Sequence, residues 1–219
     1  MQAISSLQSN QQLVRFSHAN NKAKAVLPQV DVQQQGLELN PKAVNDVVTF
    51  MSEANNIKQL DRKGWLDVGV KRPESVAAHS WSTAMLAMLL TPKDLDVNKT
   101  IKYAMLHDLA EAHVGDITPL DGISDEECTK LEANAMDKLC KDFPHLKTLW
   151  QEYEFGRTPE AKFCKQLDRL DMGIQAMLYS KKKHNTTEFI ERCKQTVTHP
   201  VLKPVLDEVI RRTNIQKSK

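Results

Sequence analysis

The sequence predicts an all-α fold, and three observations support this prediction. Helix start signals recur along the chain, as at Asn40-Pro41, where a cap residue precedes a proline at the first helical position. Apolar residues follow these signals at helical intervals, as they do from Val44 to Met51. Alternating apolar and polar runs bounded by turns, the pattern of strands, are nearly absent, and there is no internal repeat.

The first two helices are expected at the clearest of these signals. Pro41 begins the first, and Asn40 can accept a hydrogen bond from its first turn. The second opens at Pro73-Glu74-Ser75 and ends before Pro92, because proline cannot continue a helix. Leu89 is expected on its inward face. The apolar positions of this helix are Val76, Trp81, Met85, Leu86 and Leu89.

A third helix is expected from the cap residue Asn98 to Gly115, a residue type that often ends helices. Its apolar stripe consists of Ile101, Ala104, Met105 and Leu109. Further helices are expected over residues 124–142, 144–153, 159–182, 187–197 and 200–212. Four methionines are expected to fill the core: Met85, Met88, Met105 and Met172.

Residues 1–40 differ from the rest of the chain. They are rich in Gln, Asn and Ser, and no acidic residue precedes Asp31. We interpret them as a disordered extension. Arg15 and Lys22 among Ser and Gln also suit an organellar transit peptide. The predicted domain covers residues 41–214, with a tail at 215–219. A cytoplasmic location is expected, and a mitochondrial or other organellar location is the alternative.

Composition limits the classes of partner. The chain has 219 residues, 41% of them hydrophobic, which suits one domain with a full-sized core. A formal charge of +2 creates no global field to recruit a nucleic acid polymer or a membrane. No apolar run approaches the ~20 residues needed to span a bilayer. The four cysteines lack CxxC spacing and are expected to be free thiols in a reducing compartment.

Ionisable residues gather near the end of the third predicted helix. His107 and Asp108 are adjacent, and Glu111 follows His107 by one helical turn, so both side chains would share a helix face. Asp116, after Gly115, adds another carboxylate at the same end. Clustered carboxylates repel one another, so this helix end needs a cation or abundant water.

His79 and Asp168 complete a candidate metal site. Each lies among apolar residues of a predicted helix. Taken singly, a hydrogen-bonded core histidine and a solvated aspartate are the ordinary interpretations. With His107 and Asp108 they offer two imidazoles and two carboxylates. This set suits Mn, Co, Fe or Zn better than Ca, in an octahedral site with positions open for water and substrate.

The order of these residues resembles the HD-domain superfamily of metal-dependent phosphohydrolases. A closer resemblance, to the 5′-deoxynucleotidase family, covers about residues 43–214. The motifs that carry it are Gly64-Trp65, Arg72-Pro73-Glu74-Ser75-Val76, His79, His107-Asp108-Leu109-Ala110-Glu111, Gly115-Asp116-Ile117-Thr118-Pro119 and Lys165-Gln166-Leu167-Asp168. The resemblance implies an HD-domain helical bundle, usually a homodimer, that removes phosphate from deoxyribonucleoside 5′-monophosphates. His79, His107, Asp108 and Asp168 would hold a divalent cation, Mn²⁺ or Co²⁺.

Glu111 and Asp116 are the candidate catalytic acid and base. One would orient or deprotonate the attacking water, and one would protonate the departing 5′ oxygen. The resemblance also implies that they hold a second cation, such as Mg²⁺, together with the backbone carbonyl of Ile117.

Substrate contacts are expected around Trp65. Arg62, Lys63 and Arg72 are basic groups near this residue, able to bind phosphate while the indole packs against a sugar or base. The resemblance implies that Trp65 and Arg62 discriminate deoxyribose from ribose. The alternative is that Trp65 is a core residue and the basic groups are solvated.

Other functions are compatible with an HD domain: a cyclic-nucleotide phosphodiesterase, a nucleoside triphosphohydrolase, or a non-catalytic metal-bound nucleotide sensor. A fully ligated dinuclear centre would need further histidines after His107, and only His113 and His145 are available before Asp168. A sensor would be expected to lack Glu111 or Asp116. Both are present, which favours catalysis.

Overall fold

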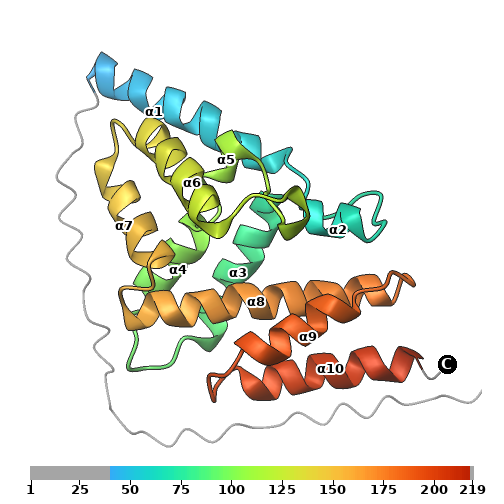
Figure 1. The fold of residues 1–219 in the computed structure, drawn as a ribbon. Coiled ribbons are helices and arrows are strands. Elements are labelled where there is room, and N and C mark those ends of the chain that lie inside the picture. Colours follow the sequence, from blue (N-terminus) through green and yellow to red (C-terminus); the bar gives the residue numbers. More distant parts are fainter. Residues whose placement is uncertain (1–39, 218–219) are drawn as a thin grey trace, which may run out of the picture. The chain divides into compact units, whose positions relative to one another are not determined.

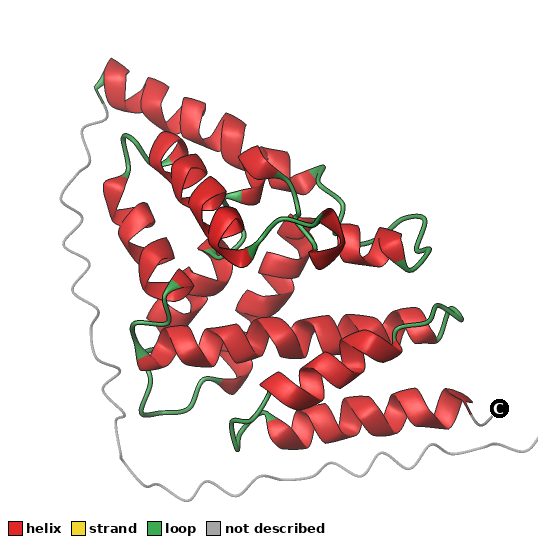
Figure 2. Ribbon diagram, viewed as in Figure 1, coloured by secondary structure: helices red, strands yellow, loops and turns green. Residues whose placement is uncertain are grey.

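The computed structural model describes residues 40–217, with side chains up to Thr213. Every regular element in this range is a helix, and the one isolated β-bridge joins Asp61 to Ser75 (Figure 2). The predicted all-α class is confirmed. The extension or transit peptide predicted for residues 1–40 falls, up to residue 39, outside the described residues.

The helices follow one another with short connections (Figure 1). They are α1 (Pro41–Ala54), η1 (Asn55–Lys58), α2 (Lys63–Asp67), α3 (Val76–Leu90), α4 (Val97–Leu106), α5 (Glu111–Val114), η2 (Pro119–Asp121), α6 (Asp125–Leu139), α7 (Pro144–Glu154), α8 (Pro159–Ser180), α9 (Thr187–Thr196) and α10 (Lys203–Lys217). The predicted cap Asn40 accepts from Ala43 N, and Ser75 caps α3 by accepting from Ala78 N. Helix α10 continues past the domain boundary expected at residue 214.

Helix α8 lies at the centre of the helical domain. It packs against α3, α4, α7, α9 and α10, and Figure 1 shows α9 and α10 beside it. Its buried face includes Phe163, Leu167 and Leu170, which join Trp65 in the main core cluster. Because α8 is covered on several sides, Asp168 is held among buried residues.

The third predicted helix is two helices, so the prediction of one helix from Asn98 to Gly115 is wrong. The cap is Asp96, whose carboxylate accepts from the backbone N–H groups of the next turn, and α4 ends at Leu106. Tighter i→i+3 bonds follow, such as Glu111 N to Asp108 O, so His107 and Asp108 do not lie within a continuous helix. Adjacent side chains of a helix point about 100° apart, whereas this turn directs both toward one space.

The outer side of α3 and α4 is apolar, contrary to prediction. Leu89 is 72% exposed rather than inward, and Met85, Met88 and Met105 are exposed rather than core-filling. Met172 is buried, as predicted. The inner side of α3 is built from small and polar residues, among them His79, Ser80, Thr83, Ala84 and Ala87. Periodicity therefore could not identify the inward face of this helix.

The cysteines agree with the prediction of free thiols. None of the four forms a disulfide, and three of them are buried. Among the described residues, no helix combines the length and the apolar character that crossing a membrane requires.

Candidate metal centre and its cavity

The four predicted ligands converge from α3, the turn after α4, and α8. His79 Nε2 lies 3.2 Å from His107 Nε2 and 3.2 Å from Asp168 Oδ1. Asp108 Oδ2 lies 3.2 Å from His107 Nε2 and 3.7 Å from His79 Nε2. The ligand atoms of His79, His107 and Asp168 all lie within 4.8 Å of one another. This cluster of histidines and aspartates fits a metal site.

The Nδ1 atoms of both histidines already have hydrogen-bond partners. His79 Nδ1 lies 2.8 Å from Asp171 Oδ2, and His107 Nδ1 lies 2.8 Å from the carbonyl oxygen of Ala104. These oxygens accept hydrogen bonds, so we assign the proton of each neutral ring to Nδ1. Both Nε2 atoms then present lone pairs to each other at 3.2 Å. A cation bound between them satisfies both, as in metal sites with oriented imidazoles.

The electrostatics of the cluster also favour a positive charge near His79 Nε2. Burial and Arg62 lower the pKa of His79, but hydrogen bonds with Asp168 and Asp171 outweigh them and raise it to about 9. Burial raises the pKa of Asp168, yet Arg169 and His79 hold it below its ordinary value. The carboxylates therefore remain ionised and can bind a divalent cation.

Asp171 is a functional residue that sequence reasoning missed. Besides binding His79, it accepts a hydrogen bond from Ser82 Oγ at 2.5 Å, so its carboxylate is fixed from two sides. Its position three residues after Asp168 places both aspartates on one face of α8. That three-residue spacing is the feature of the sequence that could have identified Asp171.

Glu111 and Asp116 also line the cavity that adjoins these ligands. Glu111 is 9% exposed, and its Oε2 atom has no hydrogen-bond partner among the described residues. Burial, Asp108 and Asp116 raise the pKa of Glu111 well above its ordinary value. Burial also raises the pKa of Asp116, although its carboxylate accepts from Lys63 N at 2.5 Å. The unpaired oxygen of Glu111 provides a place for a proton or a further cation.

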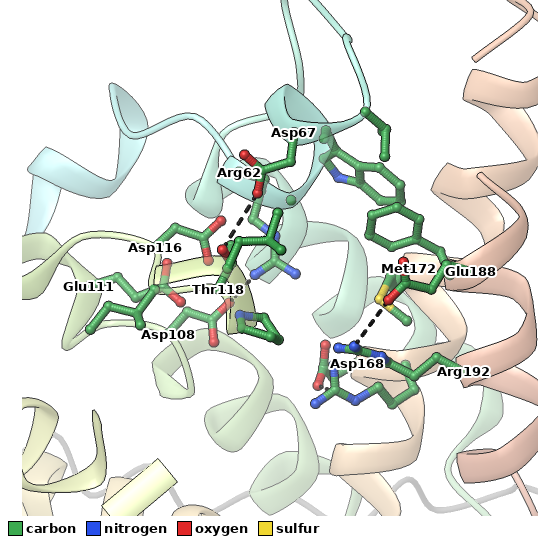
Figure 3. Close-up of a pocket in the computed structure, with 18 of the residues that line it drawn as sticks. Arg62, Asp67, Asp108, Glu111, Asp116, Thr118, Asp168, Met172, Glu188 and Arg192 are labelled. Carbon is green, nitrogen blue, oxygen red and sulfur yellow. Dashed lines mark hydrogen bonds and ion pairs between the residues drawn. The ribbon is translucent and has the colours of Figure 1, made fainter. Parts of the chain in front are cut away.

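The cavity has a volume of about 600 Å³, within the range of small-molecule sites. Figure 3 shows Glu111, Asp116 and Asp108 on one side and Asp168, Met172 and Arg192 on the other. An apolar wall faces the carboxylates, and its members are Trp65, Val68, Met172 and Phe189. The cavity therefore combines a metal-binding end with a surface suited to an apolar ring or sugar.

The predicted substrate residues lie in different surroundings. Trp65 lines the cavity but is 2% exposed, because Phe189 packs on its ring and its Nε1 donates to Glu74 Oε1 at 3.0 Å. Arg62 Nη1 donates to Asp108 Oδ2 at 2.9 Å. Arg72 is exposed and does not line the cavity.

Three further cavity residues were missed: Arg169 on α8, and Phe189 and Arg192 on α9. Arg169 follows Asp168 directly, and the spacing of Phe189 and Arg192 puts them on one helix face. Nothing in the sequence indicates that this face meets the metal-binding end, since that depends on how α9 packs.

The fold and the paired histidines and aspartates define an HD-domain protein. The sequence matches the HD domain family over residues 54–208, so the chain belongs to this family, as the motifs predicted. It is 41% identical over 142 residues to 5′-deoxynucleotidase HDDC2 of Xenopus laevis, covering 63% of this chain and 71% of that protein. It is 34% identical over 179 residues to 5′-deoxynucleotidase HDDC2 of Homo sapiens, covering 77% and 88%. A solved structure from Pyrococcus horikoshii OT3 shares 34% identity with a TM-score of 0.66, covering 75% of this chain and 99% of that one.

Proposed function

We propose that this protein is a metal-dependent 5′-deoxynucleotidase, which hydrolyses deoxyribonucleoside 5′-monophosphates to the deoxynucleoside and orthophosphate. The observation that carries the proposal is the convergence of two imidazole Nε2 atoms with Asp108 and Asp168 at one end of a cavity with an apolar wall. The names of the HDDC2 relatives support the same activity.

His79, His107, Asp108 and Asp168 would hold the principal cation. The mixed nitrogen and oxygen donors favour Mn²⁺ or Co²⁺. Glu111, Asp116 and the carbonyl of Ile117 would hold a second cation such as Mg²⁺, and the unpaired Glu111 Oε2 supports that assignment. When bound, the principal cation supplies Lewis acidity, lowering the pKa of a bound water and withdrawing charge from a phosphoryl oxygen.

Glu111 and Asp116 would carry the proton transfers. One takes a proton from the attacking water or orients it, and one gives a proton to the departing 5′ oxygen. Burial raises the pKa of both carboxyl groups, which favours a protonated form able to donate to the leaving group. Lys63 N holds the Asp116 carboxylate in place.

The nucleoside would pack against the apolar wall. Trp65 would exclude a ribose 2′-hydroxyl, and its fixed orientation between Glu74 and Phe189 supports that role. Arg62, paired with Asp108, would help to position the sugar.

We also infer a homodimer formed through the outer side of α3 and α4. Trp81, Met85, Met88 and Leu89 are exposed along one side of α3, and Met105 is exposed on the adjoining α4. Exposed Trp and Met side chains of this kind are enriched at protein contacts. A second copy of the chain is the expected occupant, because the family resemblance implies a dimeric enzyme.

Phosphate release from a substrate panel tests the proposed function. The panel contains ribo- and deoxyribonucleoside 5′- and 3′-monophosphates, a cyclic nucleotide and a deoxynucleoside triphosphate, assayed after metal removal and after re-addition of Mn²⁺, Co²⁺ or Mg²⁺. We expect metal-dependent release from deoxyribonucleoside 5′-monophosphates. Release from the cyclic nucleotide or the triphosphate alone would replace this function with one of the other HD-domain activities.

A further inference from the structure

We propose that Arg169 and Arg192 form a phosphate clamp, which binds the substrate's scissile phosphate and the orthophosphate product beside the metal ligands. The proposal rests on the proposed function and deepens it. It adds phosphate-binding groups on α8 and α9 to the basic residues that precede α3.

Close packing of α9 on α8 brings both arginines to the lining of one cavity. A Cβ atom at Gly173 would lie 2.9 Å from Cys193 Sγ, so a larger residue at this position would force the contact to shift. The Cys193 thiol donates to the carbonyl oxygen of Arg169 at 3.0 Å. Arg192 adjoins Cys193, and both arginines line the same cavity. The contact that joins the helices therefore also fixes the clamp.

Both guanidinium groups have unused hydrogen-bond donors. Arg169 Nε lies 3.8 Å from Asp168 Oδ2, and Arg192 Nη2 lies 3.6 Å from Glu188 Oε1. These distances exceed hydrogen-bond length, and neither guanidinium forms a hydrogen bond within residues 40–217. The Glu188 side chain is 85% exposed, so its ion pair with Arg192 is weak.

Like charges facing one cavity repel each other, and an anion between them relieves the repulsion. A phosphate monoester suits this place, because guanidinium groups bind phosphate oxygens through paired N–H donors. Figure 3 shows Arg192 extending from α9 to the side of the cavity where Asp168 lies. A phosphate near the metal ligands would therefore be within the region that both arginines border.

The other basic side chains near the cavity pair with carboxylates or do not line the cavity. Arg62 donates to Asp108, and Glu111 and Asp116 also act on its charge. The Lys63 ammonium lies 2.9 Å from Asp121 Oδ1. Arg72 does not line the cavity. Among the described residues, Arg169 and Arg192 are thus the lining cations whose guanidinium groups form no hydrogen bond with the protein.

Orthophosphate binding to the metal-loaded full-length protein tests the clamp without requiring turnover. Isothermal titration compares wild type with Arg169→Gln, Arg192→Gln and Arg192→Lys, and metal content is measured in every sample. Arg211→Gln is the matched control, because Arg211 pairs with Glu208 on the exposed side of α10. We expect each clamp Gln variant to weaken orthophosphate binding about 10- to 100-fold, the range for hydrogen bonds to a charged group. Arg192→Lys should recover part of the loss, and the control should bind as wild type does.

The outcomes separate the clamp from the proposed function. Weaker orthophosphate binding with normal metal content supports the clamp, even if the substrate panel reveals another phosphate ester as substrate. Wild-type affinity in a folded Arg192→Gln variant overturns it, whatever Arg169→Gln does to folding. Absence of orthophosphate binding to the wild type also overturns it. Loss of affinity only for a deoxyadenosine 3′,5′-bisphosphate, with orthophosphate unaffected, would assign the arginines to a second phosphate and contradict the clamp.

Discussion

The Nδ1 atom of His79 lies 2.8 Å from Oδ2 of Asp171, and this contact leaves the opposite ring nitrogen facing His107 and Asp168. Asp171 would therefore orient the proposed metal ligand His79 from the side of the ring away from the other ligands. Outer groups of this kind select the tautomer of the imidazole and increase its basicity.

Asp171→Asn should reduce metal affinity about 10- to 100-fold, because an amide can also donate to Nδ1 and so favour the wrong tautomer. Metal titration of the demetallated protein measures the effect. Ser82→Ala is the milder comparison, since it removes only one hydrogen bond to Asp171. Equal metal affinity in wild type and Asp171→Asn would show that Asp171 is not needed for the site.

Glu111→Ala and Asp116→Ala should fold normally and retain the principal metal, yet turn over at least ~100-fold more slowly, because each loses an acid or base. Single-turnover rates and metal analysis separate this loss from ligand loss. Near-normal turnover in both variants would refute the assigned roles.

Trp65 should set sugar preference while also supporting the fold. Trp65→Ala should cost about 3–5 kcal/mol of unfolding free energy, because the indole is buried. Trp65→Phe is therefore the informative variant. Widening the space beside the sugar should shrink the deoxy-to-ribo ratio of kcat/KM toward one, by an amount worth about 1–3 kcal/mol. An unchanged ratio in folded Trp65→Phe would place sugar discrimination elsewhere, at Arg62 or the loop that begins at Ile117.

Glu132 on α6 should make stability depend on pH. Burial and Glu154 raise its pKa to about 7 in the folded protein, above the ordinary value of 4.5. The folded chain then binds the proton more tightly than the unfolded chain, so the free energy of unfolding should fall as pH rises from about 4.5 to 7.

Glu132→Gln should remove the Glu132 contribution to this slope, leaving that of Glu111 and Asp116, and should stabilise the protein at pH 8 by about 1–3 kcal/mol. Denaturant melts at several pH values provide the comparison, with Glu126→Gln as the control because Glu126 is exposed on the same helix. The same pH slope in Glu132→Gln and wild type would exclude this residue as its source.

Leu89→Glu and Trp81→Glu should convert the inferred homodimer to a monomer, because each places a charge on the apolar outer side of α3. Analytical ultracentrifugation measures the mass in solution. Glu188→Lys is the charge-changing control, because the Glu188 side chain on α9 is exposed. A monomeric wild type, or variants that remain dimeric, would contradict an interface at α3 and α4.

The convergence of His79, His107, Asp108 and Asp168 was predictable, whereas their local geometry was not. Two histidines and two aspartates in this order indicate a metal centre, because few other kinds of site need these side chains together. The turn at His107 was hidden, because apolar residues continue at helical spacing on both sides of it. Where α4 ends, His107 Nδ1 bonds to the Ala104 carbonyl, a contact that the apolar pattern does not indicate.

Features that depend on packing between distant helices also escaped prediction. Helix α3 has apolar residues on its outer side and small residues on its inner side. The apolar pattern of its sequence therefore does not indicate which side faces the core. Arg169 and Arg192 line one cavity because α9 packs on α8, where Cys193 lies beside Gly173. Such a contact between α8 and α9 has no local signature in the sequence.

The cluster of His79, His107, Asp108 and Asp168 is proposed to bind the metal that hydrolysis requires. The most direct measurement is metal content together with phosphate release from a deoxyribonucleoside 5′-monophosphate, in wild type and His107→Ala, before and after demetallation. We expect the wild type to lose activity on demetallation and regain it with Mn²⁺ or Co²⁺, and His107→Ala to bind less metal and release no phosphate. Full activity in demetallated wild type, or in folded His107→Ala, would contradict the account.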